Sequence, residues 1–166
     1  MKRILVVLGL SLLFTGLTYK AEAQSYKNGL GVRFSPFYGF TFKHFMNRTD
    51  AVEGILHSRW GAFKITGLWE RHTPAFSEPG LFFFYGGGAH IGGISGDRYY
   101  RGWPDDRRRG TLLLGLDGIL GLEYTIQDSN VPLNFGIDWK PTLNFAPYST
   151  FWGDEFAISV RYTFGR

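Results

Sequence analysis

The chain has 166 residues, a formal net charge of +4 and no cysteine, and 18% of its residues are aromatic. This length predicts one domain, and the aromatic content excludes a disordered protein. The absence of cysteine excludes a disulfide framework, a thiolate nucleophile and cysteine-ligated metal sites.

The first 23 residues have the pattern of a secretory signal peptide. Basic residues at positions 2 and 3 precede an apolar run over 4–17, and Ala-Glu-Ala at 21–23 places small residues two apart. A helix that spans a membrane needs about 20 apolar residues, and this run is shorter. We therefore predict a signal peptide over 1–23 and a single mature domain over 24–166.

Removal of this leader lowers the net charge to +2, because three basic residues and one acidic residue leave with it. The basic character of the whole chain is therefore partly a property of the leader. A nucleic-acid partner would also need a clustered basic face. We expect no nucleic-acid partner.

After the leader, apolar and polar residues alternate with period two, which is typical of β-strands, and no stretch of ten residues carries a helical period. Ser35-Pro36 interrupts the first run and separates two short strands; joining them would leave seven strands. Pro141 indicates a bulge or a strand end nearby. We predict an all-β chain of eight strands, over 28–34, 37–46, 51–60, 62–72, 81–93, 111–125, 131–145 and 152–164.

The number of large apolar residues decides which face of these strands lies inside. A soluble barrel of comparable size holds about twelve large side chains, whereas the alternating apolar face carries about thirty. Several runs of 11 to 15 residues exceed the roughly 9 to 11 needed to cross a bilayer, and aromatic residues gather near strand ends, as at membrane interfaces. We predict an antiparallel, up-and-down transmembrane β-barrel with its apolar face outward.

Three segments carry a resemblance to a known family. Residues 157–164, Ala-Ile-Ser-Val-Arg-Tyr-Thr-Phe, are similar to the C-terminal strand that the outer-membrane insertion machinery recognises, and 63–70 and 85–92 are similar to middle strands. The chain resembles the small eight-stranded outer-membrane β-barrel proteins of Gram-negative bacteria, of the outer membrane protein X and W kind. The resemblance implies a monomer in the outer membrane that contacts the insertion machinery, outer-membrane lipid and lipopolysaccharide.

The polar face then lies inside the barrel and carries nearly balanced charge. Such a balance suits a filled interior, since an unpaired buried charge costs several kcal/mol, as an order of magnitude. An eight-stranded barrel filled by side chains leaves no continuous channel, so we predict an ion-pair network and not an open pore. The charged residues are Arg33, Lys43, Arg59, Lys64, Lys140 and Arg161, with Glu53, Glu70, Asp117, Glu123 and Asp138.

A catalytic alternative would combine His57 or His90 with Ser95 and with Glu53 or Glu70. No Gly-x-Ser-x-Gly motif accompanies these residues, so we predict no enzymatic activity and assign no catalytic residue. No histidine pair with strand spacing i, i+2 indicates a metal site, and we expect no cofactor. Two alternatives stay open: a lipid-modifying acyl hydrolase or acyltransferase, and a soluble periplasmic barrel that binds a small apolar ligand.

The longest connection, 94–110, contains aromatic residues and three consecutive arginines. If the first strand starts from the periplasm, this loop lies outside the cell, where long loops belong. Its arginines could bind lipopolysaccharide phosphates, or the loop could be a solvated charged segment. The sequence therefore predicts an outer-membrane barrel with a structural or surface-interaction role, and it does not name a partner for the loop.

Overall fold

The computed structural model describes residues 26–36, 38–59, 62–76, 78–94, 111–128, 130–146 and 149–165. The predicted signal peptide lies outside the described residues, as does the loop after residue 94, Ser95 included.

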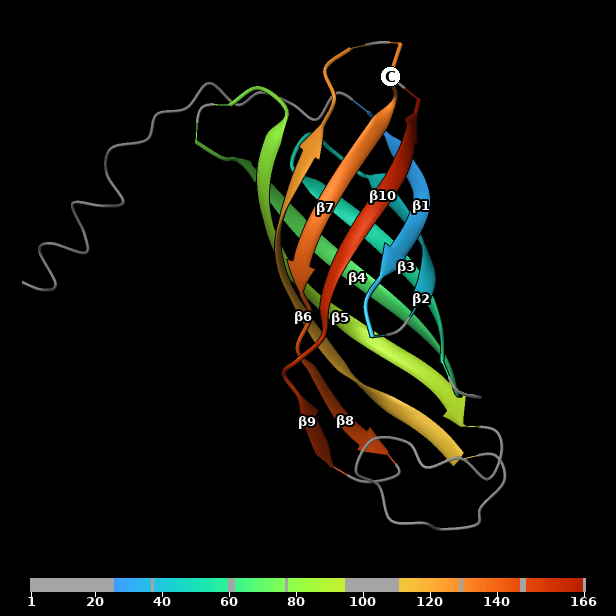
Figure 1. The fold of residues 1–166 in the computed structure, drawn as a ribbon. Coiled ribbons are helices and arrows are strands. Elements are labelled where there is room, and N and C mark those ends of the chain that lie inside the picture. Colours follow the sequence, from blue (N-terminus) through green and yellow to red (C-terminus); the bar gives the residue numbers. More distant parts are fainter. Residues whose placement is uncertain are drawn as a thin grey trace, which may run out of the picture.

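The described chain is all-β and forms a closed barrel (Figure 1). Each strand pairs antiparallel with its neighbours, β1 pairs with β10, and a β5–β6 pair closes the ring. Because β7 and β8 form one wall strand, and β9 and β10 another, the ring has eight strands, as predicted. The elements are β1 (Asn28–Phe34), β2 (Tyr38–Phe45), β3 (Asp50–Arg59), β4 (Ala62–Pro74), β5 (Leu81–Ile94), β6 (Thr111–Thr125), β7 (Leu133–Trp139), β8 (Thr142–Ala146), β9 (Thr150–Trp152) and β10 (Phe156–Phe164).

Pro141 interrupts the seventh wall strand, which confirms the predicted strand end. β7 ends at Trp139 and β8 begins at Thr142, because proline has no N–H group to donate to the ladder. The Pro141 carbonyl still accepts a hydrogen bond from the Gly118 amide at 2.9 Å. The pairing of β6 therefore continues in one register from β7 into β8 as far as Asn144, and it shifts by one residue before Ala146.

The eighth wall strand contains a β-bulge that the sequence pattern did not predict. Trp152 pairs with Thr142, whereas Phe156 pairs with Trp139, so the β9–β10 side holds one extra residue. Trp152 and Glu155 are both buried although they are three positions apart, an odd spacing that would place them on opposite faces of a regular strand. The bulge thus allows both Trp152 and Glu155 to face the interior.

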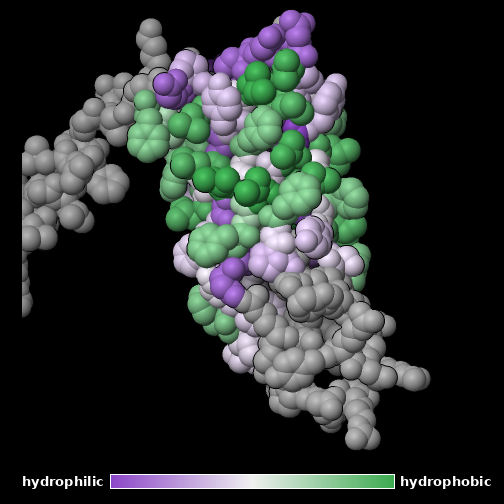
Figure 2. Space-filling view, in the orientation of Figure 1, coloured by the Kyte–Doolittle hydropathy of each residue, from purple (hydrophilic) through white to green (hydrophobic). Residues whose placement is uncertain are grey.

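The two faces of the wall are segregated as the alternation predicts. Thirty large apolar side chains among the described residues are exposed on the outside, and apolar residues cover much of the wall in Figure 2. The inner face buries charged, polar and some apolar side chains; Lys43 and Arg33 are both 0% exposed. Phe45, Phe84 and Ile55 show that the interior is not purely polar.

Both ends of the described chain lie at one end of the barrel, which we call the terminal side. Asn28 at the start of β1 pairs with Phe164 at the end of β10. The connections 46–49, 75–80 and 126–132 lie at this side, and each spans a few residues. The connection after residue 94 leaves from the opposite end, which we call the loop side.

Glycines on the inner face allow neighbouring strands to approach closely. A Cβ atom on Gly88 of β5 would overlap the carbonyl oxygen of Gly67 on β4. Gly67 itself faces outward, and a Cβ there would have no atom within 4 Å. Gly88 is therefore required for closure of the β4–β5 pair, and Gly67 is not.

We expect Gly88→Ala to lower the free energy of unfolding by about 1–3 kcal/mol, the usual cost of overpacking, because a strand must shift to admit the methyl group. Gly67→Ala is the matched control and should leave stability unchanged or slightly higher. Urea unfolding followed by tyrosine and tryptophan fluorescence measures both. Equal losses for the two variants would contradict the role assigned to Gly88.

Candidate functional site in the barrel interior

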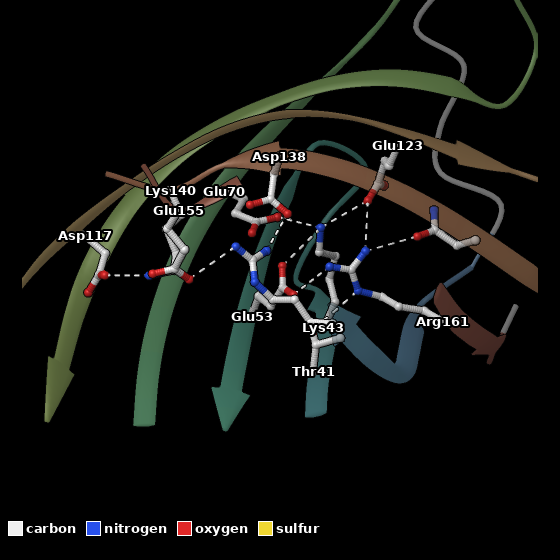
Figure 3. A network of polar contacts seen from close by, with 12 residues as sticks. Thr41, Lys43, Glu53, Glu70, Asp117, Glu123, Asp138, Lys140, Glu155 and Arg161 are labelled. Carbon is white, nitrogen blue, oxygen red and sulfur yellow. Dashed lines mark hydrogen bonds and ion pairs between the residues drawn. The ribbon is translucent and has the colours of Figure 1, made fainter. Parts of the chain in front are cut away.

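The described interior charges form two clusters along the barrel axis. The terminal-side cluster consists of Lys43, Glu53, Glu70, His72, Glu123 and Arg161. The loop-side cluster consists of Arg33, Lys64, His90, Asp117, Asp138, Lys140 and Glu155. Figure 3 shows side chains of both clusters reaching toward one another from different strands.

Lys43 on β2 is the centre of the terminal-side cluster. Its ammonium nitrogen lies 2.7 Å from Glu70 on β4, 3.0 Å from Glu123 on β6 and 3.3 Å from Glu53 on β3. The three carboxylates match the three N–H donors of an ammonium group. Because β2 and β6 are diametrically opposite in the ring, the Lys43–Glu123 contact crosses the whole lumen.

Arg161 on β10 adds a second set of contacts across the same level. Its Nη2 lies 2.6 Å from Glu53 Oε1, and its Nη1 donates to the amide oxygen of Asn134 at 3.2 Å. The Thr41 hydroxyl also donates to Glu53. Glu53 therefore accepts from β2 and β10 together, which fixes three wall strands around one carboxylate.

His72 lies between two carboxylates of this cluster. Its Nε2 is 3.1 Å from Glu70 Oε2, and its Nδ1 is 3.3 Å from Glu123 Oε1. The imidazole stacks on Phe84 with ring centroids 5.2 Å apart and meets the edge of Phe45 at 4.8 Å. His72 is fully buried among these groups, and both of its ring nitrogens face acceptors.

Tyr26 closes the terminal side of the interior. Its ring packs against Phe45 and Ala51, and its hydroxyl donates to Glu123 at 3.4 Å. Burial, together with the negative charge of Glu123, raises the pKa of the Tyr26 phenol well above its ordinary value, so this hydroxyl stays a donor. Tyr26, which lies two residues before β1, is thus part of the barrel interior.

The loop-side cluster is organised around Glu155. This carboxylate lies 3.0 Å from Lys140, 3.5 Å from Lys64 and 3.6 Å from Arg33, which also pairs with Asp138. Lys64 comes from β4, diametrically opposite the strand that carries Glu155. The lumen is therefore crossed by ion pairs at a second level.

The described residues of the catalytic alternative are His57, His90, Glu53 and Glu70, and they lie on the inner face of the barrel. Glu53 pairs with Arg161 and Lys43, and Glu70 with Lys43 and His72. His90 contacts Asp117 at 2.6 Å and Asn144 at 3.1 Å, and His57 is buried on the inner face of β3. Ser95 lies outside the described residues, and the expectation that the chain is not an enzyme stays a prediction.

Ten of the eleven predicted interior charges are found inside, and the side chain of Arg59 lies outside the described part of the structure. Sequence reasoning missed Glu155, because it counted the inward residues of the last strand only from Ala157 onward. Alternation counted back from Ala157 was the signal available, since it places position 155 on the inner face.

Comparisons with protein families, curated proteins and solved structures found no match for this chain. Among the described residues, no helix has the length and apolar character needed to cross a membrane. Within that same part of the chain, no group of three or more histidine and acidic side chains has an arrangement that could hold a metal ion.

We expect Glu155→Gln to lower the free energy of unfolding by about 3 kcal/mol, because it leaves three buried cations with one carboxylate too few. Glu78→Gln, in an exposed turn, is the control and should change stability by no more than about 0.5 kcal/mol. Urea unfolding midpoints measure the difference. Equal midpoints for the two variants would show that the loop-side pairs contribute little.

Proposed function

We propose that this chain is an outer-membrane β-barrel protein with a structural or surface-interaction role, whose apolar wall faces lipid and whose filled interior is not an open pore. One observation carries the proposal: the barrel is inverted relative to a soluble protein, with charges buried and large apolar side chains exposed. On β10, Ile158 is 57% exposed, whereas Arg161 is 1% exposed. Soluble monomers rarely expose continuous apolar surface on this scale.

The closed ladder also suits a lipid environment. In lipid every backbone donor and acceptor must be paired inside the structure, so only helices and closed barrels span a bilayer. The strands β4, β5 and β6 have 13, 14 and 15 residues, more than the roughly 9 to 11 that a tilted strand needs. Their length supports a spanning barrel.

Exposed aromatic side chains lie near both ends of the wall, as the two interfaces of a membrane would favour. On the terminal side they are Phe83, Tyr124, Tyr162 and Phe164. On the loop side they are Phe34, Tyr38, Phe63 and Phe156. This arrangement supports a bilayer that covers the wall between the two sets.

The topology supports an orientation with the terminal side in the periplasm. Barrels of this class have short periplasmic turns and longer extracellular loops. The turns beside the chain ends are short, and the connection over 94–110 leaves from the other side. In this orientation the connection begins on the side where lipopolysaccharide lies, and β10 is the strand offered to the insertion machinery.

The two levels of ion pairs across the lumen support a closed interior. Lys43–Glu123 and Lys64–Glu155 each join diametrically opposite strands, so both ion pairs cross the lumen where a water channel would have to pass. The same contacts argue against the soluble alternative, because a barrel that binds an apolar ligand inside needs an apolar lumen. No contact among the described residues favours the lipid-modifying alternative.

The first experiment is to isolate outer membranes from expressing cells and to run them on a detergent gel with and without boiling. We expect the chain in the outer-membrane fraction, with an unboiled band that migrates differently and a difference that boiling abolishes. Recovery in the soluble fraction without a heat-dependent shift would overturn the proposal. Mass spectrometry of lipid A from the same cells tests for a changed acyl pattern.

Ile158→Lys tests the lipid-facing wall directly. A lysine in this belt should lower the free energy of unfolding from phosphatidylcholine vesicles by about 2 kcal/mol, because its charge must enter hydrocarbon. Met46→Lys is the matched control, since Met46 is 52% exposed but follows β2 in a turn. In a soluble barrel both changes would sit in water and would be equally mild, which would contradict the proposed location.

A further inference from the structure

The two carboxylate neighbours of His72 favour a ring with a proton on each nitrogen, which is one proton more than a neutral imidazole carries. Neutral histidine has one N–H donor and one acceptor nitrogen. In this barrel both nitrogens face carboxylate oxygens, Glu70 at 3.1 Å and Glu123 at 3.3 Å. Both neighbours are anions, so the doubly protonated imidazolium, which has N–H groups on both sides and a positive charge, is the form that pairs favourably with both of them.

The charge count of the terminal-side cluster leads to the same requirement. Lys43 and Arg161 supply two positive charges, and Glu53, Glu70 and Glu123 supply three negative charges. All five side chains are almost completely buried, so the excess negative charge has no access to solvent. One additional proton balances the cluster, and His72 lies between two of its three carboxylates.

The Glu123 oxygen that faces His72 also contacts Tyr26, the residue that closes the terminal side of the interior. Glu123 Oε1 accepts from the Tyr26 hydroxyl at 3.4 Å and faces His72 Nδ1. The Tyr26 ring contacts Phe45 in an edge-to-face arrangement at 5.2 Å, and Phe45 contacts His72. A change in the charge of His72 therefore acts on Tyr26 through Glu123 and through Phe45.

We propose that the terminal-side cluster is a binding site for a single proton, held by His72 between Glu70 and Glu123, and that this proton keeps Tyr26 seated in the terminal mouth of the barrel. When the proton leaves, three buried carboxylates face two cations, and Glu123 repels the remaining negative charge of Glu53 and Glu70. Tyr26 lies outside the strands, whereas the charged residues of the cluster lie within them. Release of Tyr26 therefore admits water to Glu123 with the least disturbance of the barrel wall. The inference concerns the interior alone and holds whether or not the wall faces lipid.

The linkage between proton binding and barrel closure determines how the closed population changes with pH. The closed form binds one proton more than the open form, so acid favours closure and rising pH favours opening. A single proton changes the ratio of open to closed barrel by about tenfold per pH unit across the range in which the proton is lost. The groups that face His72 are Glu70 on β4, Glu123 on β6, Lys43 on β2, and the rings of Phe45 and Phe84.

The direct test observes the proton. Nitrogen-15 labelled full-length protein, folded in detergent, is studied by long-range proton–nitrogen correlation of the histidine rings, with His72→Gln used for assignment. We expect both ring nitrogens of His72 to be protonated while Tyr26 is seated. A neutral His72 ring in the closed barrel would overturn the proposal.

The second test measures opening, and the absence of native cysteine makes it simple. Ala51→Cys places a thiol in the buried cluster with Tyr26 and Phe45, and Met46→Cys places one in an exposed turn. The ratio of their labelling rates with a methanethiosulfonate reagent cancels the reagent's own pH dependence. We expect the Ala51→Cys thiol to be protected in acid and its relative rate to rise about tenfold per pH unit through the transition.

Further variants in the Ala51→Cys background distinguish a labelling step caused by loss of the proton from one caused by a change in side-chain packing. Glu70→Gln removes the excess charge and should abolish the pH step with the mouth closed, and His72→Lys should do the same by supplying a permanent cation. His44→Gln is the matched control, because His44 contacts the Asn28 amide and, among the described residues, no ion pair joins it to a carboxylate, and it should leave the step unchanged. A step that survives in Glu70→Gln and His72→Lys would assign it to another group and overturn the proposal.

Discussion

The contact of Lys43 with three carboxylates is the constraint on which the rest of the barrel depends. A buried ammonium without partners would cost several kcal/mol, as an order of magnitude, so Glu53, Glu70 and Glu123 must all face it. They come from β3, β4 and β6, and a slip of one residue in any of these strands would turn a carboxylate into the outer wall. The cross-barrel cluster therefore fixes the register of the strands as well as the neutrality of the interior.

The apolar exterior follows from that filled interior. Two levels of ion pairs occupy the lumen, so an eight-stranded ring has no room left inside for its large apolar side chains. With period-two alternation, every residue that follows an inward charge points outward, as Phe34 does after Arg33. The chain can bury its charges or its apolar side chains but not both, and a surrounding lipid phase is the medium in which burial of the charges is the stable choice.

The strands could be predicted from the sequence wherever alternation was unbroken, and the residues of β6 match the prediction at both ends. The strand break at Pro141 was also predictable, because it follows from the covalent structure of one residue. The bulge was not, since Trp152 and Glu155 both point inward at an odd spacing that no period-two pattern contains. The contact of His72 with Glu123 was equally out of reach, because only barrel closure brings β4 and β6 together, whereas Glu70 lies two residues before His72 on the same face of β4.

Glu155 and the proton site solve the same problem, the balance of buried charge, at the two ends of the lumen. Without Glu155, the cations Arg33, Lys64 and Lys140 would share two carboxylates, Asp117 and Asp138. With it, the loop-side cluster has three charges of each sign and needs no titrating group. The terminal-side cluster, by contrast, has one carboxylate more than the number of its lysine and arginine side chains. Balance there depends on a proton, which makes the terminal side the end of the barrel that responds to pH.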